Sequence, residues 1–171
     1  PLIRKALKAE FPQVPVLSLN FSGLEKGNGL ELSIGLILKL AYCIFYGDNM
    51  MTLYNQTLPY EVEKGETDKA RAECMEMIFR MLDKNAYKKY KEITRKMLEI
   101  FKKVKRSDEE KIKVGIVGEI YVKYSPLGNS HLEKFLLSEG CEPVVPGLMD
   151  YVLYCIVNNV NDGKFYGRNS F

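Results

Sequence analysis

The sequence predicts an α/β fold, in which a short parallel sheet is flanked by helices and carries a helical insertion. Two apolar runs rich in β-branched residues, one in each half of the chain, predict buried strands. In the last third, the order strand, loop, helix, strand, helix is typical of a parallel crossover. We therefore expect an N-terminal strand-helix part at 1–60, a helical arm or insertion at 61–107 and a C-terminal β-α-β-α unit at 108–171.

The N-terminal part is expected to contain a strand and two helices. The run Val14–Leu19 predicts a buried strand, and a loop with three glycines follows it. Apolar residues at helical spacing predict a mostly buried helix over Leu30–Tyr46. Gly47 is expected to end this helix, and Asp48 to cap a second one that extends through Tyr54.

Two amphipathic helices are predicted for the insertion, as an antiparallel pair or as one kinked arm. The first covers Thr67–Leu82 with Thr67 as its N-cap, and the second covers Ala86 to about Lys105. From 84 to 106 the sequence has ten basic and two acidic residues. This excess is ordinary for a solvated helix face, but it would also suit phosphate groups or a partner. The candidate phosphate contacts are Lys88, Lys89 and Lys91.

The C-terminal unit begins with Ile112–Gly118, a run apolar enough for a central strand of a covered parallel sheet. Ser130, with Glu133 three residues later, matches a capping box and predicts a helix that Gly140 ends. The remaining elements are a strand over Glu142–Pro146 and an apolar helix over Leu148–Val157.

The eleven-residue loop Glu119–Asn129 is the best candidate for a site. In open α/β sheets, ligands bind at the carboxyl ends of the strands, where loops and helix N-termini meet. Gly118 allows close backbone approach there, and Glu119 is the first side chain beyond it. Ser130 and its neighbours offer free backbone N–H groups to an anion. An equally good explanation of the sequence is structural: the glycines allow the chain to turn, and Glu119 forms a hydrogen bond within the loop.

Several catalytic classes find no support in the sequence. Neither glycine cluster matches a dinucleotide-binding or Walker A motif. His131 is the only histidine, and its position at a predicted helix start disfavours a Ser-His-Asp or Cys-His arrangement. We therefore assign no catalytic residue.

Composition and cysteine spacing limit the environment and the partners. The four cysteines contain no C-x-x-C pair, which disfavours a zinc ribbon or a disulfide scaffold and predicts a reducing cytoplasm. Cys43 and Cys74 lie on apolar helix faces and are expected to be buried. A net charge of +3 is too small to indicate nucleic-acid binding by itself. No apolar run reaches the length of a membrane span.

Three stretches resemble the dehydratase-like region of proteins related to 2-hydroxyacyl-CoA dehydratases and their CoA-substrate-specific activases. They are Tyr46–Met51, Leu58–Asp68 and Lys113–Tyr124. The resemblance covers about 14–159 and implies a Rossmann- or flavodoxin-like domain within a larger polypeptide. In that family a 4Fe-4S cluster relays an electron to a CoA thioester. The resemblance implies that this chain alone is inert and that its partners are the rest of its polypeptide, acyl-CoA, and a second copy or a dehydratase subunit.

The resemblance also implies roles for individual residues. Gly118, Glu119, Tyr121 and Asn129 would line a crevice for substrate or cluster. None of the four cysteines stands in a cluster-binding motif, so no metal ligand and no cofactor are assigned within this chain. Two alternatives remain open. One is a non-catalytic scaffold that uses the basic helical arm for assembly, and the other is an RNA-binding module that rests on the basic helix alone.

Overall fold

The computed structural model describes residues 2–14 and 33–167 of the chain, and it divides into two compact units, Pro1–Ile37 and Leu38–Phe171. The first unit contains α1 (Leu2–Glu10), which is followed by a turn. The Phe11 N–H donates to the Leu7 carbonyl over 2.7 Å at the end of this helix. The predicted strand Val14–Leu19, except for Val14, and the glycine-rich loop after it lie outside the described residues.

One continuous helix, α2 (Ile34–Asn55), replaces the two helices predicted from the sequence. Gly47 does not end the first helix, and Asp48 does not cap a second one. A glycine inside a helix costs only about 1 kcal/mol relative to alanine. Tyr46 and Met50 are buried on either side of Gly47, and the packing of these large side chains offsets that cost.

The larger hydrophobic core lies among α2, α3 (Glu66–Asp83) and α4 (Tyr90–Lys102), and the short 3-10 helix η1 (Leu58–Tyr60) connects α2 to α3. The predicted pair of helices is confirmed, although α4 begins four residues later than expected. These two helices supply most of the buried residues of this core. Its buried members are Tyr46, Met50, Ala70, Cys74, Ile78, Tyr87, Ile93, Met97, Ile100, Phe101 and Val104.

The start of α3 is capped by a glutamate that precedes it, and not by Thr67 as predicted. The Glu61 carboxylate accepts hydrogen bonds from the N–H groups of Gly65 and Thr67, each over 3.0 Å. Gly65 has a φ of 90°, and this left-handed turn brings the chain back over Glu61. Thr67 is instead buried inside the first turn, and its hydroxyl has no hydrogen-bond partner.

The sheet of the described residues has two parallel strands, β1 (Lys113–Gly115) and β2 (Glu142–Val144). Parallel pairing is as expected, but the described structure is mostly helical. The prediction of a central, covered strand over Ile112–Gly118 is wrong, since Ile112 is 73% and Val117 82% exposed. Within the described part of the chain, β1 has a single neighbouring strand, so most of this apolar run is left uncovered there.

The segment between the strands contains two helices, α5 (Ile120–Tyr124) and α6 (Leu132–Ser138). The predicted long loop therefore includes a short helix. The predicted capping box is wrong, because Ser130 has a φ of 54° and the N–H of Leu132 donates instead to Asn129 Oδ1 over 3.2 Å. At the other end, Gly140 follows α6 with a φ of 74°, as its sequence position predicts.

The last helix, α7 (Leu148–Tyr166), is longer than predicted and contains no buried residue. Both oxygens of Asp48 hold its start, because they accept hydrogen bonds from the N–H groups of Leu148 (3.0 Å) and Met149 (2.7 Å). Asp48 is thus a helix cap, but for a helix 100 residues away in the chain. No helix among the described residues is long and apolar enough to cross a membrane.

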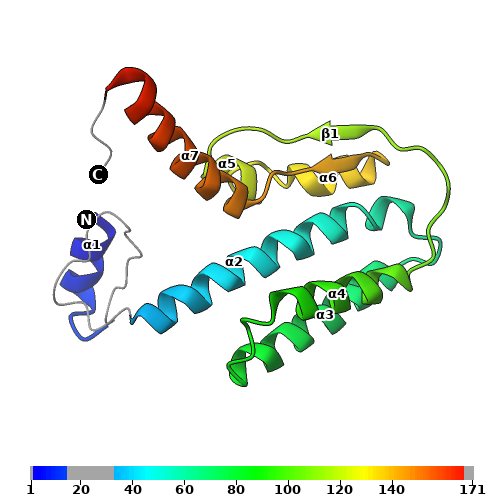
Figure 1. The fold of residues 1–171 in the computed structure, drawn as a ribbon, viewed down its shortest axis with the longest axis horizontal. Helices are drawn as coiled ribbons and strands as arrows, with labels where there is room; N and C mark the ends of the chain where they lie inside the picture. The colour runs from blue at the N-terminus through cyan, green and yellow to red at the C-terminus, as the bar shows by residue number, and fades with distance from the viewer. Residues whose placement is uncertain (1, 15–32, 168–171) are drawn as a thin grey trace. The chain divides into compact units, whose positions relative to one another are not determined.

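Figure 1 shows α2 between the α3–α4 pair and the β1–β2 sheet. Met51 of α2 packs against the second core cluster, which is formed by Ile116, Leu136 and Val145. Because α2 contributes to both clusters, it joins the helical part of the second unit to the β-α-β-α part.

Candidate functional site

Two polar side-chain contacts fix the C-terminal β-α-β-α part against the segment around α2. Asn55 Nδ2 donates to Glu133 Oε2 over 3.0 Å, which ties the end of α2 to α6. The Tyr60 hydroxyl donates to Glu142 Oε2 over 2.6 Å, which ties η1 to β2. Together with the Asp48 cap of α7, these contacts bring the loop before α6 next to α2 and α3.

An open pocket of about 620 Å³ lies where α2, α3 and α6 meet, and we call it the α2–α6 pocket. Most of its surface is apolar. The apolar side chains come from Met50, Met51, Leu58, Met75 and Leu137. A pocket of this volume, with apolar walls and a few polar groups, is typical of small-molecule sites.

Arg71 supplies a cation to this pocket. Its guanidinium lies 3.2 Å from Asp68 Oδ1 and 4.7 Å from the centre of the Tyr54 ring. The Tyr54 hydroxyl donates to the same Asp68 oxygen over 3.1 Å. Burial and this hydrogen bond to Asp68 raise the pKa of Tyr54, so its phenol stays protonated at neutral pH. These contacts favour one orientation of the Arg71 guanidinium at the pocket, although the side chain is 50% exposed.

The side of the pocket formed by α6 supplies further polar groups. Asn55 is only 4% exposed, and its amide holds the Glu133 carboxylate. Lys134 and His131 also line the pocket from this side, and Asn129 lines it from the loop before α6. This arrangement can bind a molecule that has an apolar part and an anionic or hydrogen-bonding end.

Of the residues predicted for the crevice, only Asn129 lines the pocket. Glu119 is exposed at the N-cap position of α5, and Gly118 forms the preceding turn with a φ of 145°. Tyr121 is 58% exposed and lies over Gly128, where an added Cβ would come within 2.8 Å of its ring. Ser130 is exposed beside the pocket-lining residues.

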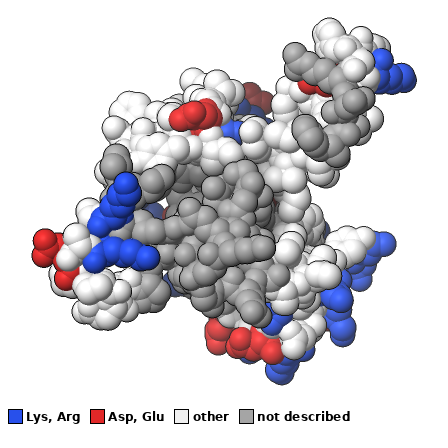
Figure 2. Space-filling model, turned by 90° about the vertical axis from the view of Figure 1, so that its left-hand side faces the viewer, with Lys and Arg blue, Asp and Glu red and all other residues white. Residues whose placement is uncertain are grey.

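The predicted phosphate contacts lie elsewhere. Lys88 and Lys89 are on the turn before α4 and Lys91 is in its first turn, and all three are exposed. Lys89 Nζ is 3.7 Å from Glu92 Oε2. Figure 2 shows Lys and Arg side chains gathered at the lower edge of one face, the height at which Figure 1 places the α3–α4 turn. Arg71 precedes this turn by roughly 20 Å of helix at 1.5 Å per residue.

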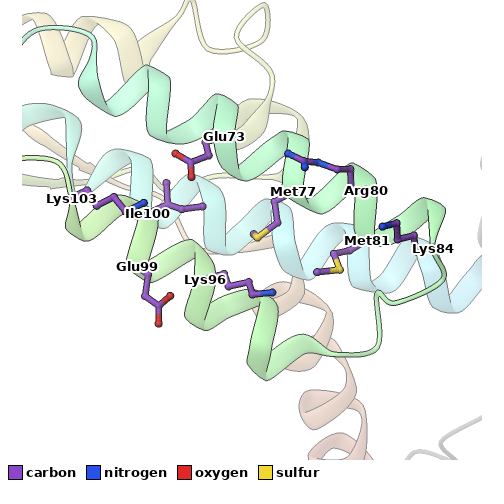
Figure 3. Close-up of a pocket in the computed structure, with 9 residues that line it drawn as sticks. All are labelled: Glu73, Met77, Arg80, Met81, Lys84, Lys96, Glu99, Ile100 and Lys103. Atoms are coloured by element: carbon purple, nitrogen blue, oxygen red, sulfur yellow. The ribbon is translucent and has the colours of Figure 1, made fainter.

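A second pocket, of about 470 Å³, follows the line between α3 and α4 (Figure 3). We call it the α3–α4 groove. It is separate from the α2–α6 pocket, because the two share no lining residue.

The cysteines do not fit a metal cluster. Cys74 is buried as expected, and its burial raises its pKa to about 11, so the thiol stays protonated. Cys43 is exposed, contrary to the prediction, because α2 is apolar on more sides than its neighbours cover. Within residues 2–14 and 33–167, no group of three or more His, Cys, Asp or Glu side chains is placed to hold a metal ion.

Most residues of the pocket, including Arg71 and the methionines, are not predicted from the sequence. The available signal was local, since Asp68 and Arg71 stand three residues apart on a predicted helix and can pair there. That signal does not reveal the neighbouring α6, which is distant in the sequence. Comparison with protein-family models, with curated proteins and with solved structures finds no match to this chain.

Proposed function

We propose that this chain belongs to a protein related to 2-hydroxyacyl-CoA dehydratases and their activases, and that it forms one wall of the crevice for acyl-CoA. The observation that carries the proposal is the α2–α6 pocket, which combines apolar walls with Arg71 and Lys134. Asn129 supports it, because the family resemblance points to this residue and the residue lines the pocket.

The residues suit binding better than catalysis. The methionine side chains would contact the acyl or pantetheine part, since thioether chains adapt to irregular apolar surfaces. Arg71, which Asp68 and Tyr54 contact, and Lys134 would contact anionic groups. The 4Fe-4S cluster would be held by other parts of the assembly.

The direct test is titration of the chain with butyryl-CoA, followed by calorimetry and by amide NMR shifts. We expect shift changes at Met51, Asn129 and Leu137. Arg71→Ala and Lys134→Ala should each weaken binding several-fold, whereas Lys69→Ala, an exposed lysine outside the pocket, should not. Absence of binding, or equal losses in all three variants, would remove acyl-CoA as the ligand.

The cluster part of the proposal needs a separate measurement. The chain and the longest polypeptide that contains it are reconstituted anaerobically with iron and sulfide, and bound iron and the EPR signal after reduction are recorded. We expect iron only in the longer polypeptide. Iron in neither polypeptide would favour the scaffold function. Stoichiometric iron in the isolated chain would contradict the prediction that none of its cysteines is a cluster ligand.

A second candidate function is that of an assembly scaffold, and α7 favours it. Nine large apolar side chains of this helix are exposed, from Val152 at 39% to Tyr166 at 77%. Exposed apolar surfaces of this extent usually mark interaction sites.

The basic helical arm is a separate surface that could drive assembly. If it does, association between chains should weaken steeply with salt, and charge reversal at Lys88, Lys89 and Lys91 should abolish it.

A further inference from the structure

We propose that the α3–α4 groove docks an acidic amphipathic helix of a partner protein. The inference deepens the scaffold function and does not depend on acyl-CoA binding, because the groove and the α2–α6 pocket share no residue. Figure 3 shows the groove, with Met77 and Met81 extending from α3 toward α4.

The groove has an apolar floor formed by Met77, Met81 and Ile100. Ile100 is buried, whereas the two methionines are half-buried. Methionine is common on surfaces that accept apolar side chains of varied shape, because its chain is flexible and polarisable. The floor therefore fits an occupant that presents apolar side chains.

The rim of the groove carries four cations and two carboxylates. Two of the cations have intrahelical partners, since Arg80 lies 3.2 Å from Glu76 and Lys96 lies 2.8 Å from Glu92. Lys84 and Lys103 form no ion pair with any described residue. Charge complementarity therefore favours an acidic occupant, with Lys84 and Lys103 as its main contacts.

The length of the groove is compatible with a short helix. The α3 residues of its rim run from Glu73 to Lys84, which corresponds to roughly 16 Å, or about three helical turns. An amphipathic helix of this length places apolar residues at i, i+3, i+4 and i+7 along one face and leaves its flanks for acidic residues.

The same residues disfavour nucleic acid as the occupant. No aromatic side chain lines the groove, so it offers no surface on which bases stack. The apolar floor would also remain unfilled by a nucleic-acid strand.

The probe is a fluorescein-labelled 18-residue peptide with leucine at the i, i+3, i+4 and i+7 positions and glutamate elsewhere. Binding to the chain is followed by fluorescence anisotropy, with an otherwise identical lysine peptide and a 12-nucleotide oligo-U RNA as comparisons. We expect the acidic peptide to bind, with at least tenfold weaker affinity at 500 mM than at 50 mM NaCl. Neither the lysine peptide nor the RNA should bind at comparable concentration.

Lys84→Gln combined with Lys103→Gln should weaken peptide binding at least tenfold. The matched control, Lys69→Gln with Lys164→Gln, removes the same charge away from the groove and should change binding less than threefold. Since Lys84 and Lys103 stand at the C-caps of α3 and α4, thermal unfolding checks that the variants remain folded.

Amide NMR shifts of the unsubstituted chain locate the binding site without any substitution that could disturb folding. The acidic peptide should shift Met77, Met81 and Ile100 and leave Asn129 unchanged. The proposal is overturned if the peptide does not bind, if both double variants bind equally, or if the shifts lie outside the groove. Preferential binding of the RNA would also overturn it and would point to phosphate recognition.

Discussion

Carboxylates outside the helices cap the starts of α3 and α7, and Glu61, the cap of α3, shows how pH acts on such a contact. Partial burial by itself raises the pKa of the Glu61 carboxyl, but the N–H groups of Gly65 and Thr67 outweigh that effect and leave the pKa below its ordinary value. The lower pKa means that the ionised carboxylate stabilises the folded state. This stabilisation is complete above the unfolded pKa of about 4.3 and is lost as the pH falls through the folded value.

Glu61→Gln should therefore lower the free energy of unfolding by about 1 kcal/mol at pH 7, the usual effect of a lost helix cap. The difference from the unsubstituted chain should shrink as the pH falls below 4. Urea unfolding at pH 7 and pH 3.5 measures both values. Glu63→Gln, an exposed neighbour, is the control and should have little effect at either pH. A loss that does not change with pH would show that the charge of Glu61 is unimportant.

Tyr60 and Glu142 form a second residue-scale contact, across the two parts of the second unit. Glu142 is 3% exposed, and its other oxygen lies 3.7 Å from Lys113 Nζ. The hydrogen bond to Glu142 raises the pKa of Tyr60. Tyr60→Phe leaves this buried carboxylate without its closest donor. We therefore expect the free energy of unfolding, measured with urea, to fall by about 2 kcal/mol. Tyr166→Phe, at an exposed position, should change stability little.

At the scale of elements, α2 and α7 are joined through a close approach of Gly147 to Asp48. A Cβ at Gly147 would stand 2.8 Å from Asp48 Oδ2, so an alanine there must displace the carboxylate that caps α7. Gly147 has an ordinary φ of −63°, so an alanine would meet no backbone strain. Asp48→Ala and Gly147→Ala should each lower the free energy of unfolding by about 1 kcal/mol, because both remove the same helix cap.

Because both substitutions remove one interaction, their effects should not add. The double variant is expected to be no less stable than Asp48→Ala alone, as measured by urea unfolding in a double-mutant cycle. Asp108→Ala, in an exposed loop, serves as the control. Fully additive losses would mean that Gly147 is needed for a reason other than the approach of Asp48.

The elements that sequence reasoning predicted well depend on neighbours in the chain. Gly140 follows α6 because a left-handed residue is needed there, and both strands arise from short apolar runs. Asp48 was misassigned because its real partners are 100 residues away. Local pattern alone suggested a cap for the next residues, and the buried Tyr46 and Met50 kept α2 continuous through Gly47 instead.

The candidate site was predictable only in part for the same reason. Asn129 was expected near a ligand, and it does line the α2–α6 pocket, but it also caps α6 in place of Ser130. The sequence does not reveal that α3 lies against this loop, so Arg71 was missed. A pocket between elements that are distant in the chain requires knowledge of their packing, which periodicity does not provide.

At the scale of the second unit, the two core clusters differ in size, and α7 belongs to neither of them. Its contacts with the rest of the unit include the Asp48 cap and the half-buried residues Leu148 and Met149. Beyond Asp150 the exposed side chains are largely apolar. The stability of the unit should therefore depend little on the remainder of this helix.

Removal of residues 151–171 tests this directly. We expect the free energy of unfolding to change by less than about 1 kcal/mol, because surface changes away from buried contacts have small effects. Binding of the fluorescent dye ANS, which reports exposed apolar surface, should fall at the same time. A large loss of stability would mean that α7 packs against the chain or a second copy in solution. Concentration dependence of that loss would then distinguish a second copy, since only assembly between chains responds to dilution.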